Sequence, residues 1–127
     1  MSGVHDFTIE CSGDLIIENV NDSTIFINGT VSSAVIKSVH GAYIMLSSSG
    51  SVNVKDCSIT ELSISAHQLR IHDSNDCVFK ICCEAGSIVE DCTGLSFCPI
   101  SSGQDEYKWK NVEDFTSFDQ SSFTFKN

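Results

Sequence analysis

The middle of the chain reads Val52-Asn53-Val54-Lys55-Asp56, and the same pattern returns at Leu69-Arg70-Ile71-His72-Asp73. In each stretch two apolar residues flank a polar one, and a second polar residue and an aspartate follow. Apolar residues at every second position are typical of a β-strand that buries one face. Aspartate favours turns, because its short side chain bonds the neighbouring backbone. The pattern therefore predicts short strands that end at corners.

This pattern recurs along most of the chain at intervals of 17 to 19 residues. The clearest apolar series comprises Ile17, Ile36, Val54, Ile71 and Val89, preceded two residues earlier by Leu15, Ala34, Val52, Leu69 and Ser87. Two further apolar series comprise Phe26, Ile44, Leu62, Phe79 and Phe97, and Leu46, Ile64 and Ile81. A polar column holds Glu18, Lys37, Lys55, His72 and Glu90, followed by a corner column of Asn19, Ser38, Asp56, Asp73 and Asp91.

A repeat of this length predicts an all-β fold, a parallel β-helix with about five coils and roughly three short strands in each coil. We expect one domain over residues 1–127, with coils between about residues 7 and 99. The composition agrees, since 13 Ile and 10 Val stand against 5 Leu and 4 Ala, and β-branched residues favour sheets. A β-sandwich with accidental spacing is the alternative, against which the registered series and the polar column weigh.

The last stretch breaks the repeat after Pro99. Residues 104–127 alternate charged and large aromatic residues. A solenoid needs capped ends, because an exposed terminal rung invites edge pairing. We therefore expect this segment to pack on the outside of the coils or over their open end, with Trp109 and Phe115 as apolar anchors.

The charge balance excludes several classes of partner. The formal net charge is −10, and Lys and Arg together number only 7. Binding to nucleic acid or to an anionic membrane needs clustered basic residues, so neither is expected. No apolar run approaches the ~20 residues of a membrane span, and residues 1–6 lack the basic and apolar regions of a secretory signal. We expect a cytoplasmic protein that is monomeric on its own.

The seven cysteines contain no Cys-x-x-Cys pair, which argues against a zinc ribbon or a thioredoxin-type redox site. Free buried thiols are the favoured interpretation and native disulfides the alternative. Cys57 and Cys92 are predicted to share an inward corner column with Val20 and Val39. Potential metal ligands are His67, His72 and Cys77. Because both histidines are expected at the surface, we predict no metal and no cofactor.

Familiar catalytic motifs are absent: the chain contains no Gly-x-Ser-x-Gly elbow, Walker loop or dinucleotide glycine fingerprint. Arg70 stands out as the only arginine. Because Leu69 and Ile71 point inward, Arg70 projects outward together with Gln68 and His72. Glu90 should lie diagonally across from Arg70 on the next coil. The residues alone therefore favour a surface arginine in a salt bridge with Glu90.

Three separated motifs in residues 51–115 resemble the tubulin-binding cofactor C homology domain in order and spacing. They are Gln68-Leu69-Arg70-Ile71-His72, then Ile88-Val89-Glu90-Asp91-Cys92-Thr93-Gly94-Leu95-Ser96-Phe97, and Trp109-Lys110-Asn111-Val112-Glu113-Asp114-Phe115. The resemblance implies a right-handed parallel β-helix. It also implies activation of a GTPase, tubulin for cofactor C and an Arl-type protein for the X-linked retinitis pigmentosa protein. The catalytic arginine of that family falls on Arg70, its motif glutamine on Gln68 and its motif acid on Glu90.

The resulting hypothesis is a GTPase activator of the tubulin-folding pathway, located in the cytoplasm and on the cytoskeleton. It is not itself an enzyme but supplies Arg70 in trans to β-tubulin GTP, with other folding cofactors, so that native heterodimer is released. The partner-binding residues are expected to be Gln68, His72, Glu90 and Lys55. One alternative is an activator of an Arf/Arl-type small GTPase. Another is a non-catalytic β-helix adaptor, like the actin-binding domain of cyclase-associated proteins, which would not need the Gln68-Leu69-Arg70 motif.

Overall fold

The computed structural model describes residues 5–101, 104–114 and 123–126. Within those ranges it contains thirteen strands and one short helix. They are β1 (His5–Glu10), β2 (Asp14–Asn21), β3 (Ser23–Val31), β4 (Ser33–His40), β5 (Tyr43–Ser48), β6 (Ser51–Ser58), β7 (Glu61–Ala66), β8 (Gln68–His72), β9 (Val78–Cys83), β10 (Ser87–Glu90), β11 (Leu95–Pro99), α1 (Tyr107–Lys110), β12 (Val112–Asp114) and β13 (Phe123–Phe125). The helix is too short to cross a membrane, and no other helix is found in the described residues.

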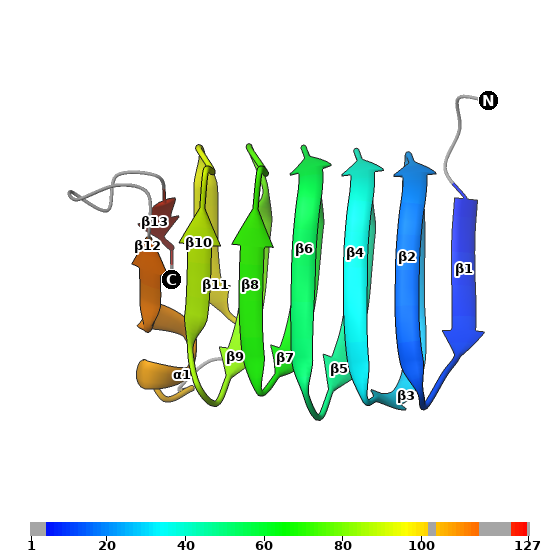
Figure 1. Cartoon of the computed structure of the whole chain (residues 1–127), viewed down its shortest axis with the longest axis horizontal. Helices are drawn as coiled ribbons and strands as arrows, with labels where there is room; N and C mark the ends of the chain where they lie inside the picture. The colour runs from blue at the N-terminus through cyan, green and yellow to red at the C-terminus, as the bar shows by residue number, and fades with distance from the viewer. Residues whose placement is uncertain (1–4, 102–103, 115–122, 127) are drawn as a thin grey trace.

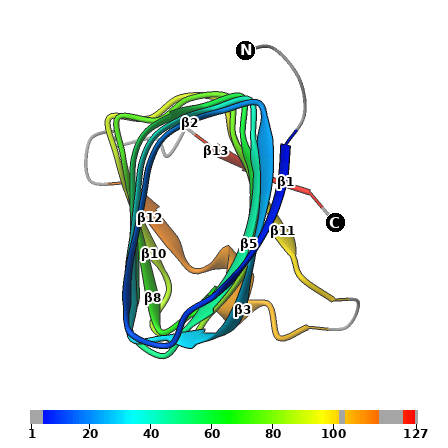
Figure 2. The same cartoon turned by 90° about the vertical axis from the view of Figure 1, so that its right-hand side faces the viewer.

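The strands form two parallel sheets, one made of the odd-numbered strands and one of the even-numbered strands (Figure 1). Each coil of the chain therefore adds one strand to each sheet, and successive coils superimpose when viewed along the stack (Figure 2). The predicted parallel β-helix is confirmed. The expectation of three strands per coil is wrong, because two strands of up to 9 residues cover the two long sides. A ladder of isolated bridges at one corner, joining Ser58, Asn75 and Thr93, is all that resembles a third strand there.

Equivalent apolar residues stack in the interior as predicted. The strand register pairs Ile17 with Ile36, Val54, Ile71 and Val89 in turn, and each of them is buried. The second predicted series is wrong at its first member, because the register places Ile25 opposite Ile44, while Phe26 faces Met45. Ile25 precedes Ile44 by 19 residues, the same step that separates Ile17 from Ile36 in the other sheet.

Two columns of corner residues adopt left-handed backbone conformations at the carboxyl end of the even-numbered strands. The first is the predicted corner column, in which φ lies between 49° and 58° at Asn19, Ser38, Asp56, Asp73 and Asp91. The second comprises Asp22, Gly41, Ile59, Asp76 and Gly94, with φ between 50° and 69°. Asparagine, aspartate and glycine tolerate this conformation better than other residues do. The repeat therefore places suitable residues at most of these corners.

The C-terminal segment extends both sheets instead of only lying on the outside of the coils. β12 pairs with β10, β13 pairs with β11, and α1 packs against β9 and β11. Trp109 of α1 is buried as predicted, with its ring 5.8 Å from that of Phe125. The other predicted anchor, Phe115, lies outside the described residues.

All seven cysteines are free thiols, and Cys57, Cys77, Cys83 and Cys92 are buried. The register confirms the predicted column of Val20, Val39 and Cys57. The column continues through Ser74, whose Oγ accepts a hydrogen bond from the backbone N–H of Cys57. The backbone N–H of Ser74 in turn lies 3.5 Å from Sγ of Cys92. Small side chains therefore fill this corner, and at Ser74 and Cys92 they also accept a hydrogen bond from the backbone of the preceding coil.

Candidate functional site

The outward face of the even-numbered sheet carries the predicted site residues. Arg70 lies in the middle of β8, directly between Asn53 of β6 and Ile88 of β10. Its own neighbours along the strand, Leu69 and Ile71, are fully buried in the core. The backbone beneath Arg70 is therefore held on both sides by strand pairing and from below by packing, while the side chain is exposed.

The side chains around Arg70 enclose a surface pocket of about 350 Å³. Its lining comprises Asn53, Val54, Lys55, Arg70, Ile71, His72, Ile88 and Glu90. The structure thus brings four of the five predicted site residues to one pocket, from β6, β8 and β10. Gln68 lies two positions before Arg70 on the same side of β8, half-buried and outside the pocket lining.

The predicted salt bridge between Arg70 and Glu90 is wrong. None of the ion pairs among the described residues includes Arg70 or Glu90. The register is the expected diagonal one, with Glu90 opposite His72 and the apolar Ile88 opposite Arg70, so the directions of the two side chains and not their positions leave them apart. The guanidinium therefore has no intramolecular ion-pair partner in the part of the chain that the structure describes.

Most other cations of the chain are neutralised by a neighbouring carboxylate. Ion pairs join Lys37 to Glu18 at 3.9 Å, Lys80 to Glu61 at 3.5 Å, Lys108 to Glu84 at 3.2 Å and Lys110 to Glu106 at 3.3 Å. Lys55 shares the pocket with Arg70 and has no such partner among residues 5–101, 104–114 and 123–126. In a chain of net charge −10, a pocket whose two cations have no ion-pair partner among the described residues and outnumber its one carboxylate, Glu90, favours an anionic ligand.

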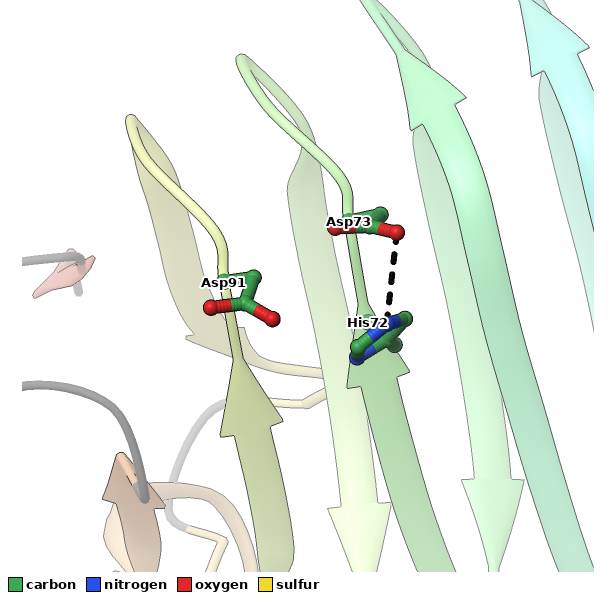
Figure 3. Close-up of side chains that lie close together, drawn as sticks. All are labelled: His72, Asp73 and Asp91. Carbon is green, nitrogen blue, oxygen red and sulfur yellow. Dashed lines mark ion pairs between the residues drawn. The ribbon is translucent and has the colours of Figure 1, made fainter.

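A second group of polar side chains lies where β8 and β10 end (Figure 3). Nε2 of His72 is 3.2 Å from Oδ2 of Asp73, and Asp91 follows on the next coil. Ligand atoms of these three residues lie within 4.8 Å of one another, so they are the side chains that could approach a cation together. The sequence places Asp73 and Asp91 in the corner column but does not reveal that His72 turns toward them. Both aspartates are exposed to solvent.

This polar group continues into a pocket of about 270 Å³ at the same corner. Its lining includes Asp73, Asp91, Ser58 and Asn75, together with His40, whose Nδ1 is 2.6 Å from Oγ of Ser58. A larger pocket of about 470 Å³ lies around Tyr43 and Glu61. None of its lining residues is basic, so it does not compete with the Arg70 pocket as a site for an anion.

An exposed guanidinium can bind a carboxylate or phosphate through two parallel hydrogen bonds, and it stays charged at any physiological pH. Here it stands on a sheet held by strand pairing rather than on a loop, so little ordering is needed when a partner docks. The fold and the site together define a parallel β-helix domain that presents one arginine on a sheet face.

The family to which this domain belongs follows from comparison with known proteins. The family model described as tubulin binding cofactor C matches residues 12–121. The chain therefore belongs to the tubulin binding cofactor C family, as its motifs predict.

Similar curated proteins carry the name tubulin-specific chaperone C. The human protein is 29% identical over 117 residues, an alignment that covers 80% of this chain and 34% of the human protein. The proteins of Bos taurus and Mus musculus are 28% and 26% identical over the same length. The chain thus spans about a third of the length of these relatives.

Proposed function

We propose that this domain activates a GTPase in the tubulin-folding pathway by supplying Arg70 in trans. The observation that carries the proposal is the guanidinium of Arg70, which has no ion-pair partner among the described residues and lies in a pocket with Lys55. The relatives named tubulin-specific chaperone C support tubulin as the partner.

The chemistry of GTP hydrolysis needs what Arg70 offers. Negative charge spreads over the oxygens of the transferred phosphoryl group in the transition state, and a guanidinium supplied by a second protein neutralises it. The transferred group ends on water within the GTPase, so this domain forms no covalent bond and is not itself the enzyme. A cation already paired with a carboxylate of its own chain would have to break that pair first. Arg70 has no such pair to break among the described residues.

The other site residues act through position and charge. Lys55 faces His72 across the pocket and adds positive charge beside Arg70. Glu90 faces His72 from the other side, where it can orient the guanidinium once the partner has excluded water, or contact the partner itself. Gln68, on the same side of β8 as Arg70, extends the contact surface toward the start of the strand.

The proposal extends to the setting in which the domain acts. It would meet β-tubulin GTP together with other folding cofactors, release the native heterodimer after hydrolysis, and work in the cytoplasm and at the cytoskeleton as a single chain. The chain spans about a third of the length of the curated relatives, so the accessory cofactors belong in the test.

Single-turnover GTP hydrolysis tests the proposal. The domain is added to tubulin, with and without folding cofactors, and to an Arl-type small GTPase, and the rate of phosphate release is measured. We expect stimulation with tubulin that is lost in Arg70→Ala and kept in Lys37→Ala, which removes a paired cation from the same sheet face. Stimulation of the Arl-type protein alone would identify the other class of GTPase. Tubulin binding without stimulation would indicate a non-catalytic adaptor.

A further inference from the structure

One residue of the second corner column differs in type from the others. Four of its five members are aspartate or glycine, and the fifth is Ile59. Its φ is 50°, in the left-handed region. For a β-branched residue this backbone conformation is an outlier, because Cβ crowds the neighbouring carbonyl group.

Packing does not explain an isoleucine at this corner. The side chain of Ile59 is 71% exposed, the most exposed of the large apolar side chains in the described residues. The other members of the column serve the fold. The carboxylate of Asp22 lies over Gly41, and that of Asp76 lies over Gly94, each close to where a Cβ of the glycine would stand. Ile59 thus combines a strained backbone with an unburied apolar surface.

Backbone strain that does not contribute to packing is often found at functional sites. The position of Ile59 in the fold indicates which function it could serve. The backbone N–H of Ile59 donates to the carbonyl of Asn75 at 3.4 Å. Asn75 and Ser58, which directly precedes Ile59, line the polar corner pocket together with Asp73. Asp73 in turn pairs with His72, which lines the Arg70 pocket. A chain of neighbouring residues therefore connects the Arg70 pocket with the corner that carries Ile59.

Because β6 and β8 are parallel neighbours, their carboxyl ends meet at the same edge of the stack (Figure 1). We infer that Ile59 is an apolar anchor for the GTP-binding partner, which would cover this edge while Arg70 enters its nucleotide site. The inference rests on the proposed function and adds a second contact to it. The partner it requires carries an apolar depression beside its nucleotide-binding surface. An anchor outside the reacting atoms contributes uniform binding, so it affects the affinity of the complex and not the rate within it.

Two substitutions at Ile59 separate this role from a structural one. Ile59→Asn and Ile59→Gly place residues that tolerate the left-handed conformation. We expect each variant to melt no lower than the unmodified domain, and Ile59→Asn to melt higher by about 2–5 °C. We also expect the concentration of tubulin that gives half-maximal stimulation of GTP hydrolysis to rise about tenfold or more. The maximal rate should be unchanged.

Ile16→Thr is the matched control, because Ile16 is 67% exposed but lies on β2, three strands of the sheet away from β8.

Binding is also measured without hydrolysis, by titrating fluorescently labelled domain with tubulin dimer. Weaker binding by both Ile59 variants, with Ile16→Thr unchanged, supports the anchor even if no stimulation of hydrolysis is found, which would overturn only the proposed function. Unchanged half-saturation and unchanged binding overturn the anchor and leave the role of Arg70 standing. A lower melting temperature in Ile59→Asn would show that the isoleucine serves the fold, and it would overturn the inference as well. Failure of the unmodified domain to bind tubulin at all would overturn both proposals.

Discussion

Arg70 of β8 and Ile88 of β10 face each other in register on the outer surface of the even-numbered sheet. The repeat that places a carboxylate near the arginine places it two residues too far along the strand, where Glu90 faces His72 instead. An apolar neighbour can support the methylene stem of an arginine without neutralising its charge. With Ile88 beside it, the guanidinium of Arg70 can bind an anionic group of a partner protein.

Arg70→Lys is the most discriminating substitution of the proposed site. An ammonium keeps the charge but cannot reproduce the planar fork of a guanidinium. We expect both Arg70→Lys and Arg70→Ala to lose about 10³- to 10⁵-fold of the stimulated GTPase rate. Binding of tubulin should fall much less, because the surrounding face supplies most of the affinity. Single-turnover hydrolysis at saturating tubulin checks the rate, and titration of labelled domain checks the binding.

Both variants should melt within a degree or two of the unmodified domain, since the side chain is exposed. If Arg70→Ala unfolds the domain, or leaves stimulation intact, the arginine is a structural surface residue and the proposed function is wrong.

Glu90→Gln and Gln68→Ala test whether neighbouring side chains position the guanidinium. Glutamine has the shape of glutamate without its charge, so Glu90→Gln removes only the charge that would act on the guanidinium in the docked complex. We expect both variants to reduce the maximal stimulated rate less than Arg70→Ala does, by about 10- to 100-fold. The half-saturating concentration of tubulin should change little. A change in half-saturation alone, at an unchanged maximal rate, would assign these residues to binding instead of positioning.

The interior columns could be predicted from the sequence because two periods coincide in it. Alternation identifies the inward positions of a strand, and the repeat of 17 to 19 residues then stacks them. The prediction failed at Phe26, since Ile25, Phe26 and Ile27 form an unbroken apolar run in which alternation distinguishes no face. Only the register of the neighbouring coil decides that Ile25 and Ile27 point inward.

The juxtaposition of the site residues was predictable for the same reason, because columns determine which residues of adjacent coils are neighbours. The directions in which their side chains point could not be predicted. The salt bridge expected for Arg70 depends on rotamers that the repeat does not specify, and His72 turns toward Asp73 at its own corner. The strain at Ile59 was invisible in the sequence as well, because it arises from a left-handed corner whose position is set by the register.

Gly94→Ala should destabilise the domain. The φ of Gly94 is +66°, and an added Cβ would stand 2.5 Å from Oδ1 of Asp76 on the preceding coil. A contact so short forces the carboxylate or the corner to move, so we expect a loss of about 1–3 kcal/mol in the free energy of unfolding. Urea denaturation measures it. Gly13→Ala is the matched control, because nothing lies within 4 Å of the Cβ that it would add.

The same contact can be tested from its other side. Asp76→Gly removes the carboxylate at a position whose own φ of 54° suits glycine. We expect Gly94→Ala to cost less in the Asp76→Gly background than in the unmodified domain, since the two changes then no longer share a clash. Strictly additive free energies would show that the cost of Gly94→Ala comes from its own backbone conformation alone.

Trp109→Ala should remove much of the stability that the C-terminal cap provides. Trp109 is 3% exposed, and the centroid of its ring lies 5.8 Å from that of Phe125. Nζ of Lys110 lies 5.0 Å from the centroid of the Trp109 ring. Truncating a buried tryptophan typically costs about 3–5 kcal/mol. Tyr107→Ala, on the same helix but 59% exposed, should stay close to the unmodified domain. Equal melting temperatures for Trp109→Ala and Tyr107→Ala would mean that α1 does not cap the coils.

The buried thiols predict a loss of stability in alkaline solution. Burial raises the pKa of Cys57 and Cys83 from an ordinary value of 9.0 to about 11, and that of Cys77 to about 12. Above pH 9 the unfolded chain releases these protons while the folded chain keeps them. The stabilising contribution is therefore complete below pH 9 and is lost as the pH rises toward 11–12, by up to about 1.4 kcal/mol per pH unit for each thiol.

We expect the free energy of unfolding, measured in urea at pH 8, 9 and 10 under reducing conditions, to fall between pH 9 and pH 10. Cys77→Ala removes one of the three protons and should make this fall shallower, whatever its effect on stability at pH 8. A stability that stays flat from pH 8 to pH 10 would contradict the assignment of these cysteines as buried neutral thiols.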